Sequence, residues 1–277
     1  MHATIIDTSA STRPAAAPVN RRSLNALLGP LDRLAEKSTR LIARHDACFE
    51  VAGEHYTLPR YLFIGPDAGN DPIRIGIFAA IHGDEPATAF ALSELLHVLE
   101  ANPALAAGYA VFAYPVVNPT GFEDDTRNSR RGRDLNREFW NNSKEPEVLL
   151  LQSELVAHAF HGLIALHADD TSDGLYGFVR GATLTKHLIE PALAAAEQFL
   201  PRNQQAVIDG FAARNGVIRQ GYQGILSAPP KVRPRPFELI LETPHHAPQF
   251  LQQKALVAAQ LSILAEYRKL LAYAANL

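Results

Sequence analysis

The sequence has little of what membrane, secreted or nucleic-acid-binding proteins need. Its single cysteine, Cys48, excludes an internal disulfide framework and fits a reducing compartment. No apolar stretch is long enough to span a membrane, and residues 1–20 have no apolar core of the signal-peptide type. No basic stripe with interleaved aromatic residues occurs either. We therefore expect a cytoplasmic protein without membrane or nucleic-acid partners.

The remaining composition is that of a globular enzyme. The chain has 277 residues, of which 47% are hydrophobic and 20% charged, and its formal net charge is -3. A chain of this length can bury the core of one ordinary α/β domain. We expect a flexible N-terminus over residues 1–20 and a single catalytic domain over residues 21–277.

Apolar runs and amphipathic segments alternate along the chain. Buried strands are predicted over residues 73–81, 109–117, 162–166 and 237–241, with helical patterns between them and after the last. This alternation predicts a three-layer α/β domain, in which a mostly parallel mixed sheet has helices on both faces. Helical spacing over residues 23–44, interrupted by Pro30, predicts two short helices or a kinked one.

Each of the four predicted strands is followed directly by a polar residue of a catalytic type. These residues are His82, Asn118, His167 and Glu242. Because the carboxyl ends of parallel strands meet at one edge of a sheet, we expect these four side chains to build a site there.

The string HGDEP places His82 and Glu85 three residues apart, directly before Pro86, which suits the first turn of a helix. This spacing lets one short turn point both side chains at a single ion, as zinc requires. On its own the motif is a weak indicator of metal binding, and the other strand ends strengthen it.

Five strings in the second part of the chain resemble a known family. They are HGDEP at 82, NPTG at 118, TRNSRRGRDLNREF at 126, ALH at 165 and ILETP at 240. In this order they resemble the zinc carboxypeptidase family (the funnelin-type metallocarboxypeptidases), and within it the small bacterial members. The related succinylglutamate desuccinylase/aspartoacylase group shares part of the pattern. The resemblance covers the chain from about residue 73 to its end.

The resemblance implies one zinc ion per chain, held by His82, Glu85 and His167. It also implies that Glu242 is the general base and that Asp134 accepts the second ring N–H of His82. Two imidazoles and one carboxylate leave zinc Lewis-acidic enough to activate water near neutral pH. A carboxylate at the end of a buried strand is desolvated and therefore suited to taking up a proton.

Substrate-binding residues follow from the same resemblance. Asn136 and Arg137 match the clamp for the terminal carboxylate of the substrate, which a guanidinium can hold bidentately. Arg127 matches the arginine that polarises the scissile carbonyl. Tyr222 resembles the mobile phenol that closes over the substrate, although a packing tyrosine fits its surroundings equally well.

Three functions remain to be distinguished. The first is a metallocarboxypeptidase-type hydrolase that cleaves a peptide or amide bond next to a residue with a free C-terminal carboxylate, including murein peptide amidases. The second is an N-acyl-amino-acid amidohydrolase of the aspartoacylase/succinylglutamate desuccinylase type. We favour the first, because the residues after Glu242 suffice for one helix but not for the β-rich domain expected in those deacylases. The third, a non-catalytic binding protein, predicts the loss of a zinc ligand or of Glu242, and all four residues are present.

The substrate is open at this stage, as is the oligomeric state. Asp169, Asp170 and Asp173 form an acidic stretch just after His167. They could face a cationic group of the substrate, such as a free amine, or form turns and helix caps. The partner is therefore expected to be a small peptide or an acyl-amino acid.

Overall fold

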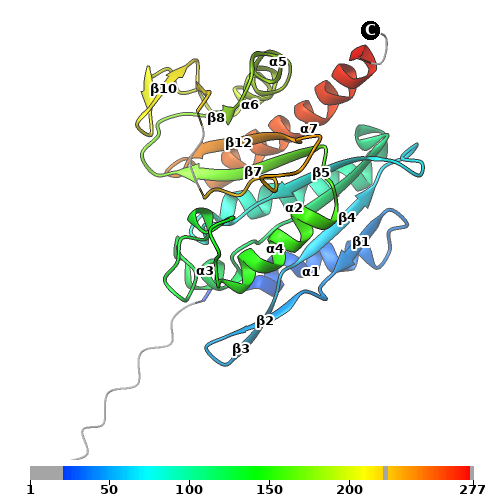
Figure 1. Ribbon diagram of the computed structural model, residues 1–277, viewed down its shortest axis with the longest axis vertical. Helices are drawn as coiled ribbons and strands as arrows, with labels where there is room; N and C mark the ends of the chain where they lie inside the picture. Colours follow the sequence, from blue (N-terminus) through cyan, green and yellow to red (C-terminus); the bar gives the residue numbers. More distant parts are fainter. Residues whose placement is uncertain (1–20, 221–223, 275–277) are drawn as a thin grey trace, which may run out of the picture.

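The apolar runs that predict buried strands form the centre of a ten-stranded mixed sheet (Figure 1). The computed structural model describes residues 21–220 and 224–274, so the predicted N-terminal segment 1–20 and Tyr222 lie outside the described residues. The strand order is β1-β4-β6-β5-β7-β12-β8-β11-β10-β9, and β2 and β3 form a separate two-stranded sheet. The strands are β1 (Leu41–Arg44), β2 (Cys48–Val51), β3 (Glu54–Thr57), β4 (Arg60–Ile64), β5 (Ile73–Phe78), β6 (Tyr109–Tyr114), β7 (Gly162–Asp169), β8 (Tyr176–Val179), β9 (Val207–Ile208), β10 (Phe211–Arg214), β11 (Val217–Ile218) and β12 (Phe237–Pro244).

Four neighbouring central strands, β6, β5, β7 and β12, run parallel to one another. Every residue of β6 and all but the last residue of β7 are buried, as expected for strands that are covered on both faces. Antiparallel pairing continues the sheet on both sides, through β4 and β1 beyond β6 and through β8 beyond β12. The predicted α/β domain, built on a mixed sheet with a parallel centre, is confirmed.

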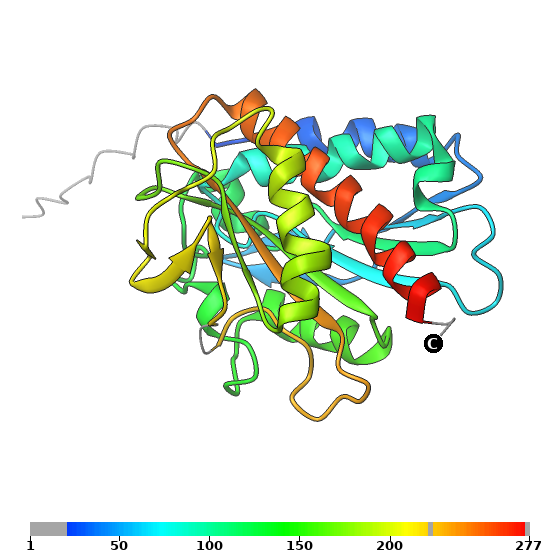
Figure 2. The same ribbon diagram turned by 90° about the horizontal axis from the view of Figure 1, so that it is seen from above.

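Helices cover both faces of this sheet. They are α1 (Leu24–Ala35), α2 (Pro86–Ala101), α3 (Pro119–Asp124), α4 (Pro146–Ala157), α5 (Ala182–Leu184), α6 (Glu190–Ala196) and α7 (Gln249–Ala274), with a π-helical turn (Thr185–Ile189) joining α5 to α6. Helix α7 runs alongside α2 and α6 on one side of the sheet, and α4 lies on the other side (Figure 2). Apolar residues of α1, α2, α6 and α7 share one core with the central strands, whereas those of α4 belong to a second core. The three predicted layers are therefore present.

The prediction for residues 23–44 is wrong in part. A single helix, α1, contains Pro30 and ends at Ala35, and Leu41–Arg44 is an edge strand paired with β4. The helical spacing of leucines stops at Leu34, and Ser38 then accepts hydrogen bonds from the backbone N–H groups of Arg40 and Leu41. This turn redirects the chain from the helix into the sheet.

The parallel strands bring His82, His167 and Glu242 to one edge of the sheet. Asn118 instead caps helix α3, where its Oδ1 accepts a hydrogen bond from Gly121 N at 2.8 Å, and it is not among the residues of the pocket described below. Strand β5 ends at Phe78, three residues earlier than predicted, and an irregular Ala-Ala-Ile segment, in which Ala80 has a positive φ of 46°, carries the chain on to His82. Strands β7 and β12 continue for two residues past His167 and Glu242. These two residues therefore lie within the strands, near their C-terminal ends, and not after them. None of the helices described in the two resolved ranges is long and apolar enough to cross a membrane.

Candidate metal centre

The turn between β5 and α2 holds two of the three candidate metal ligands. The backbone N–H of Glu85 donates to the carbonyl of His82 at 3.3 Å, and helix α2 begins at the next residue, Pro86. Thr88 Oγ1 accepts a hydrogen bond from Ala80 N at 2.9 Å and donates to the Glu85 carbonyl at 2.7 Å. Thr88, in the first turn of α2, therefore holds the backbone on both sides of the His82–Glu85 turn, at Ala80 and at Glu85.

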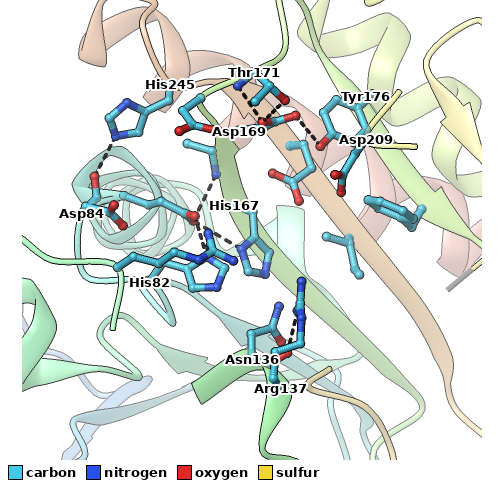
Figure 3. Close-up of a pocket in the computed structure, with 17 residues that line it drawn as sticks. His82, Asp84, Asn136, Arg137, His167, Asp169, Thr171, Tyr176, Asp209 and His245 are labelled. Carbon is cyan, nitrogen blue, oxygen red and sulfur yellow. Dashed lines mark hydrogen bonds and ion pairs between the residues drawn. The ribbon is translucent and has the colours of Figure 1, made fainter. Parts of the chain in front are cut away.

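His82, Glu85 and His167 converge in the interior, and each is at most 3% exposed (Figure 3). The Glu85 carboxylate lies between the two imidazoles. Its Oε1 is 2.6 Å from His82 Nδ1, and its Oε2 is 3.3 Å from His167 Nδ1. One potential ligand atom from each residue can be chosen so that all three lie within 4.8 Å of one another. The structure thus brings together the three residues predicted as metal ligands.

The donor set fits a zinc ion. Two imidazole nitrogens and one carboxylate are a frequent ligand set of catalytic zinc, with a further position left open. Within the described part of the chain, the buried His167 Nε2 has no hydrogen-bond partner, so contacts with protein leave this ring incompletely satisfied. Burial lowers the pKa of His167, which favours the neutral imidazole that metals bind.

Asp134 lies beside His82 as predicted. Its Oδ1 is 3.3 Å from His82 Nε2 and accepts a hydrogen bond from Asn136 N at 2.9 Å. The pKa of Asp134 is lowered, because its hydrogen bond to His82 and the nearby positive charges outweigh the effect of burial. A carboxylate on the second ring nitrogen of a histidine fixes the tautomer that presents the other nitrogen to a metal.

Arg127, in the loop that follows α3, contacts both Asp134 and His82. Its Nη2 donates to Asp134 Oδ2 at 3.0 Å, and its Nη1 lies 3.3 Å from His82 Nδ1. The Arg127 side chain is half exposed and lines the pocket beside His82. Its guanidinium therefore stands where a polar group of a ligand could reach it.

Asn136 and Arg137 form one wall of the pocket, in a short 3-10 turn (Leu135–Arg137). Asn136 is buried, and its Oδ1 accepts a hydrogen bond from Leu226 N at 3.0 Å. Arg137 is exposed, and its Nη1 donates to the Asn136 carbonyl at 2.7 Å. The anchored asparagine thereby supports the exposed Arg137, which lies beside it in the pocket (Figure 3).

Glu242 lines the same pocket, which has a volume of about 270 Å³. It is paired in register with His167 on β7 and with Tyr176 on β8. The pKa of Glu242 is raised well above its usual range, first by burial and then by the negative charges of Glu85, Asp169 and Asp209. A carboxyl group in this environment readily binds a proton.

Residues 72–204 match the model of a family described as the succinylglutamate desuccinylase/aspartoacylase catalytic domain. A solved structure from Shewanella denitrificans OS217, named as a candidate metallopeptidase, superposes with a TM-score of 0.73 at 23% identity, covering 88% of this chain and 90% of that one. Over residues 72–204 the chain is therefore similar to this family of catalytic domains, and its fold is that of the metallopeptidase structure.

Two further solved structures have the same fold. A metallo-carboxypeptidase from Burkholderia cenocepacia has a TM-score of 0.68 at 16% identity, with 89% of this chain and 68% of that chain covered. Bovine thrombin-activatable fibrinolysis inhibitor, in complex with tick carboxypeptidase inhibitor, has a TM-score of 0.67 at 16% identity, with 90% and 98% covered. At such identities these likenesses show the fold alone. No curated protein matches the sequence.

The pocket contains residues that the sequence did not point to. Tyr176 and Asp209 line the pocket opposite His82, and the Tyr176 hydroxyl donates to Asp169 Oδ2 at 2.8 Å (Figure 3). Asp209 lies in the turn between β9 and β10 with a positive φ of 49°. Nothing in the local sequence around these two residues marks them, because strand pairing alone brings them to the site.

The acidic stretch after His167 is divided by the structure. Asp169 and Asp170 line the pocket, whereas Asp173 is exposed and is not among its lining residues. Asp169 also closes a turn, since its Oδ1 accepts hydrogen bonds from the backbone N–H and the hydroxyl of Thr171 at 2.8 and 2.7 Å. The turn interpretation therefore holds for Asp169, whose side chain also borders the pocket.

Proposed function

We propose that this protein is a zinc-dependent hydrolase of the carboxypeptidase type. It cleaves a peptide or amide bond next to a residue that carries a free C-terminal carboxylate. The observation that carries the proposal is the convergence in one pocket of the His82–Glu85–His167 cluster, the carboxyl group of Glu242 and the Asn136–Arg137 wall. These are the three parts that such a reaction needs: a metal site, a proton acceptor and an anion clamp.

The metal site consists of His82, Glu85 and His167, with one zinc ion per chain. Zinc bound there would supply Lewis acidity, which polarises a carbonyl oxygen and brings the pKa of water to about 7. Asp134 holds the His82 ring in the orientation that presents Nδ1 to the ion.

Glu242 is the general base. A carboxyl group with a raised pKa can take a proton from the attacking water and return it to the leaving nitrogen at neutral pH. Its register with His167 on β7, outside the His82–Glu85–His167 cluster, supports this role.

The charged wall of the pocket orients the substrate. Asn136 and Arg137 hold the terminal carboxylate, for which the planar guanidinium is suited. Arg127 donates to the scissile carbonyl oxygen, where negative charge develops in the transition state. Tyr222 remains a prediction for closing over the substrate, and it lies outside the described residues.

The family also suggests deacylation of an N-acyl-amino acid as a second candidate function. The charges of the pocket favour peptides over succinylated substrates. Asp169, Asp170 and Asp209 line the pocket in addition to Glu85 and Glu242, and this excess of carboxylates repels a second carboxylate on the acyl group. The same charges suit a cationic group, such as the amine of the diamino acid in murein peptides.

A paired substrate screen tests this function. Peptides with a free C-terminus, including γ-D-glutamyl-diaminopimelate types, are compared with their C-terminal amides and with N-acetyl and N-succinyl amino acids. Release of the C-terminal residue from the free peptides alone supports the proposal. Turnover of the N-acyl amino acids alone would replace it with the deacylase function.

A further inference from the structure

The turn that carries His82 and Glu85 is held from outside at the carbonyl groups of both of its middle residues. Arg22 Nη1 donates to the Gly83 carbonyl at 2.8 Å, and His245 Nε2 hydrogen-bonds with the Asp84 carbonyl at 2.8 Å. Both side chains lie outside residues 72–204, which match the family model. The support of the turn therefore comes from segments before and after the matched region.

The Gly83 carbonyl is the group whose direction defines this turn. In a turn closed by a hydrogen bond from Glu85 to His82, the Gly83–Asp84 peptide is the central one. Flipping that peptide requires a φ of about +80° at the residue after Gly83, which a non-glycine residue adopts at a cost. Asp84 does not have a positive φ here. The hydrogen bond from Arg22 thus holds the unflipped peptide.

Arg22 is itself fixed on helix α3 by several contacts. Its Nη2 forms an ion pair with Asp125, its Nη1 also donates to the Phe122 carbonyl at 3.2 Å, and its guanidinium lies 5.0 Å from the centre of the Phe122 ring. The backbone N–H of Arg22 donates to the Glu123 carbonyl at 2.8 Å. Because the Arg22 guanidinium is planar and already held by these contacts, it loses little conformational entropy on binding the Gly83 carbonyl as well.

The His82–Glu85 turn and helix α3 are in close backbone contact where Arg22 bridges them. A Cβ atom built on Gly83 would lie 1.9 Å from the carbonyl carbon of Gly121, so only glycine fits there. Arg22 joins the carbonyls of Gly83 and Phe122 across this contact. Because Arg22 is anchored on α3, a displacement of the turn away from α3 would break the hydrogen bond from Nη1 to the Gly83 carbonyl.

We propose that Arg22 is a positioning residue that locks the His82–Glu85 turn in its metal-binding conformation and so sets how long the metal stays bound. This inference rests on the proposed function, because it takes His82 and Glu85 as metal ligands. Arg22 is not among the residues that line the substrate pocket, so its effect falls on the metal and not on substrate binding.

The test measures the rate at which the zinc-loaded, full-length protein loses zinc to a coloured chelator. We expect Arg22→Gln to lose zinc about tenfold faster than the wild type, as outer partners of metal ligands typically change affinity 10- to 100-fold. Arg21→Gln is the matched control, because Arg21 pairs with Glu54 and Asp124 and not with the turn. This control should stay within about twofold of the wild type, since surface ion pairs contribute little.

Two more variants separate positioning from general stability. Arg22→Lys keeps the positive charge near Asp125 but lacks the fork, and we expect zinc loss to remain faster than in the wild type. Asp125→Asn loosens the anchor while leaving Arg22 in place, and zinc loss should rise there too. All rates are measured well below the unfolding temperature of each metal-free variant.

Wild-type rates in Arg22→Gln, or full restoration by Arg22→Lys, would overturn the positioning role while leaving the proposed function intact. Equal acceleration in Arg21→Gln and Arg22→Gln would overturn it as well, because it would indicate a general loosening of the N-terminal segment. A wild-type protein that binds no zinc would remove the proposed function, and this inference with it.

Discussion

Glu242 and His167 lie side by side in register on the adjacent parallel strands β12 and β7. Their side chains therefore leave the sheet at the same level and on the same face. His167 contacts Glu85 in the metal cluster, whereas Glu242 stands next to the cluster without belonging to it. This arrangement separates holding a metal from moving a proton, and the two can be tested separately.

Replacing Glu242 by glutamine should abolish proton transfer and leave the metal in place. We expect kcat to fall by about 10²- to 10⁴-fold, the usual contribution of general acid–base catalysis, with zinc content unchanged. Glu266→Gln on α7 is the matched control and should keep full activity. Retained turnover in Glu242→Gln would exclude Glu242 as the base.

Replacing His82 by alanine should remove the metal. One of three ligands is lost, so we expect the zinc content after dialysis to fall from about one per chain to nearly none. His55→Ala, in the exposed strand β3, controls for the loss of a surface histidine. A full zinc complement in His82→Ala would mean that the ion binds elsewhere.

The clamp role of Arg137 predicts an effect that depends on the substrate. Arg137→Ala should raise KM by about 10- to 100-fold for peptides with a free carboxylate, the range for a lost hydrogen bond to a charged group. For amidated peptides, which lack this carboxylate and which we expect to be poor substrates, KM should be unaffected. Arg133→Ala, on the exposed part of the same loop, is the control. Equal effects on free and amidated peptides would contradict the clamp.

The buried carboxyl group of Glu147, in the first turn of α4, should make the stability of the protein depend on pH. It is fully buried, its carboxylate oxygens have no hydrogen-bond partner among the described residues, and burial raises its pKa to about 7. The folded protein therefore binds this proton more tightly than the unfolded chain does. The resulting stabilisation is present below about pH 4 and is lost as the pH rises through 7.

Glutamine at position 147 removes the cost of burying the charge. We expect Glu147→Gln to be more stable than the wild type at pH 8, by on the order of 1–3 kcal/mol, and the difference to shrink towards pH 5. Chemical unfolding of both proteins at the two pH values measures this. A difference that does not change with pH would show that Glu147 is not the titrating group.

The sequence predicts the centre of the site because each of its main residues adjoins a buried apolar strand. His82, His167 and Glu242 follow runs whose hydrophobicity alone marks them as central strands. In a parallel sheet the carboxyl ends of such strands lie at one edge, independently of the strands that are added at its sides. The same reasoning holds for helices α2, α4 and α7, whose apolar periodicity and prolines mark their positions and starts.

Tyr176 and Asp209, which line the pocket opposite His82, could not be predicted in this way. Tyr176 reaches the site because β8 pairs antiparallel with β12, and Asp209 because β10 joins the sheet beyond β11. Such pairings depend on long-range contacts and leave no periodic pattern in the sequence. Arg22 was missed for a related reason, since its role depends on the distance to a glycine carbonyl 61 residues away.

The most direct test of the account is the zinc content of the purified protein, measured together with peptide hydrolysis before and after treatment with a chelator. We predict about one zinc per chain, and release of a C-terminal residue that stops on chelation and returns when zinc is added. Absence of bound zinc after reconstitution, or hydrolysis that is insensitive to the chelator, would contradict the account.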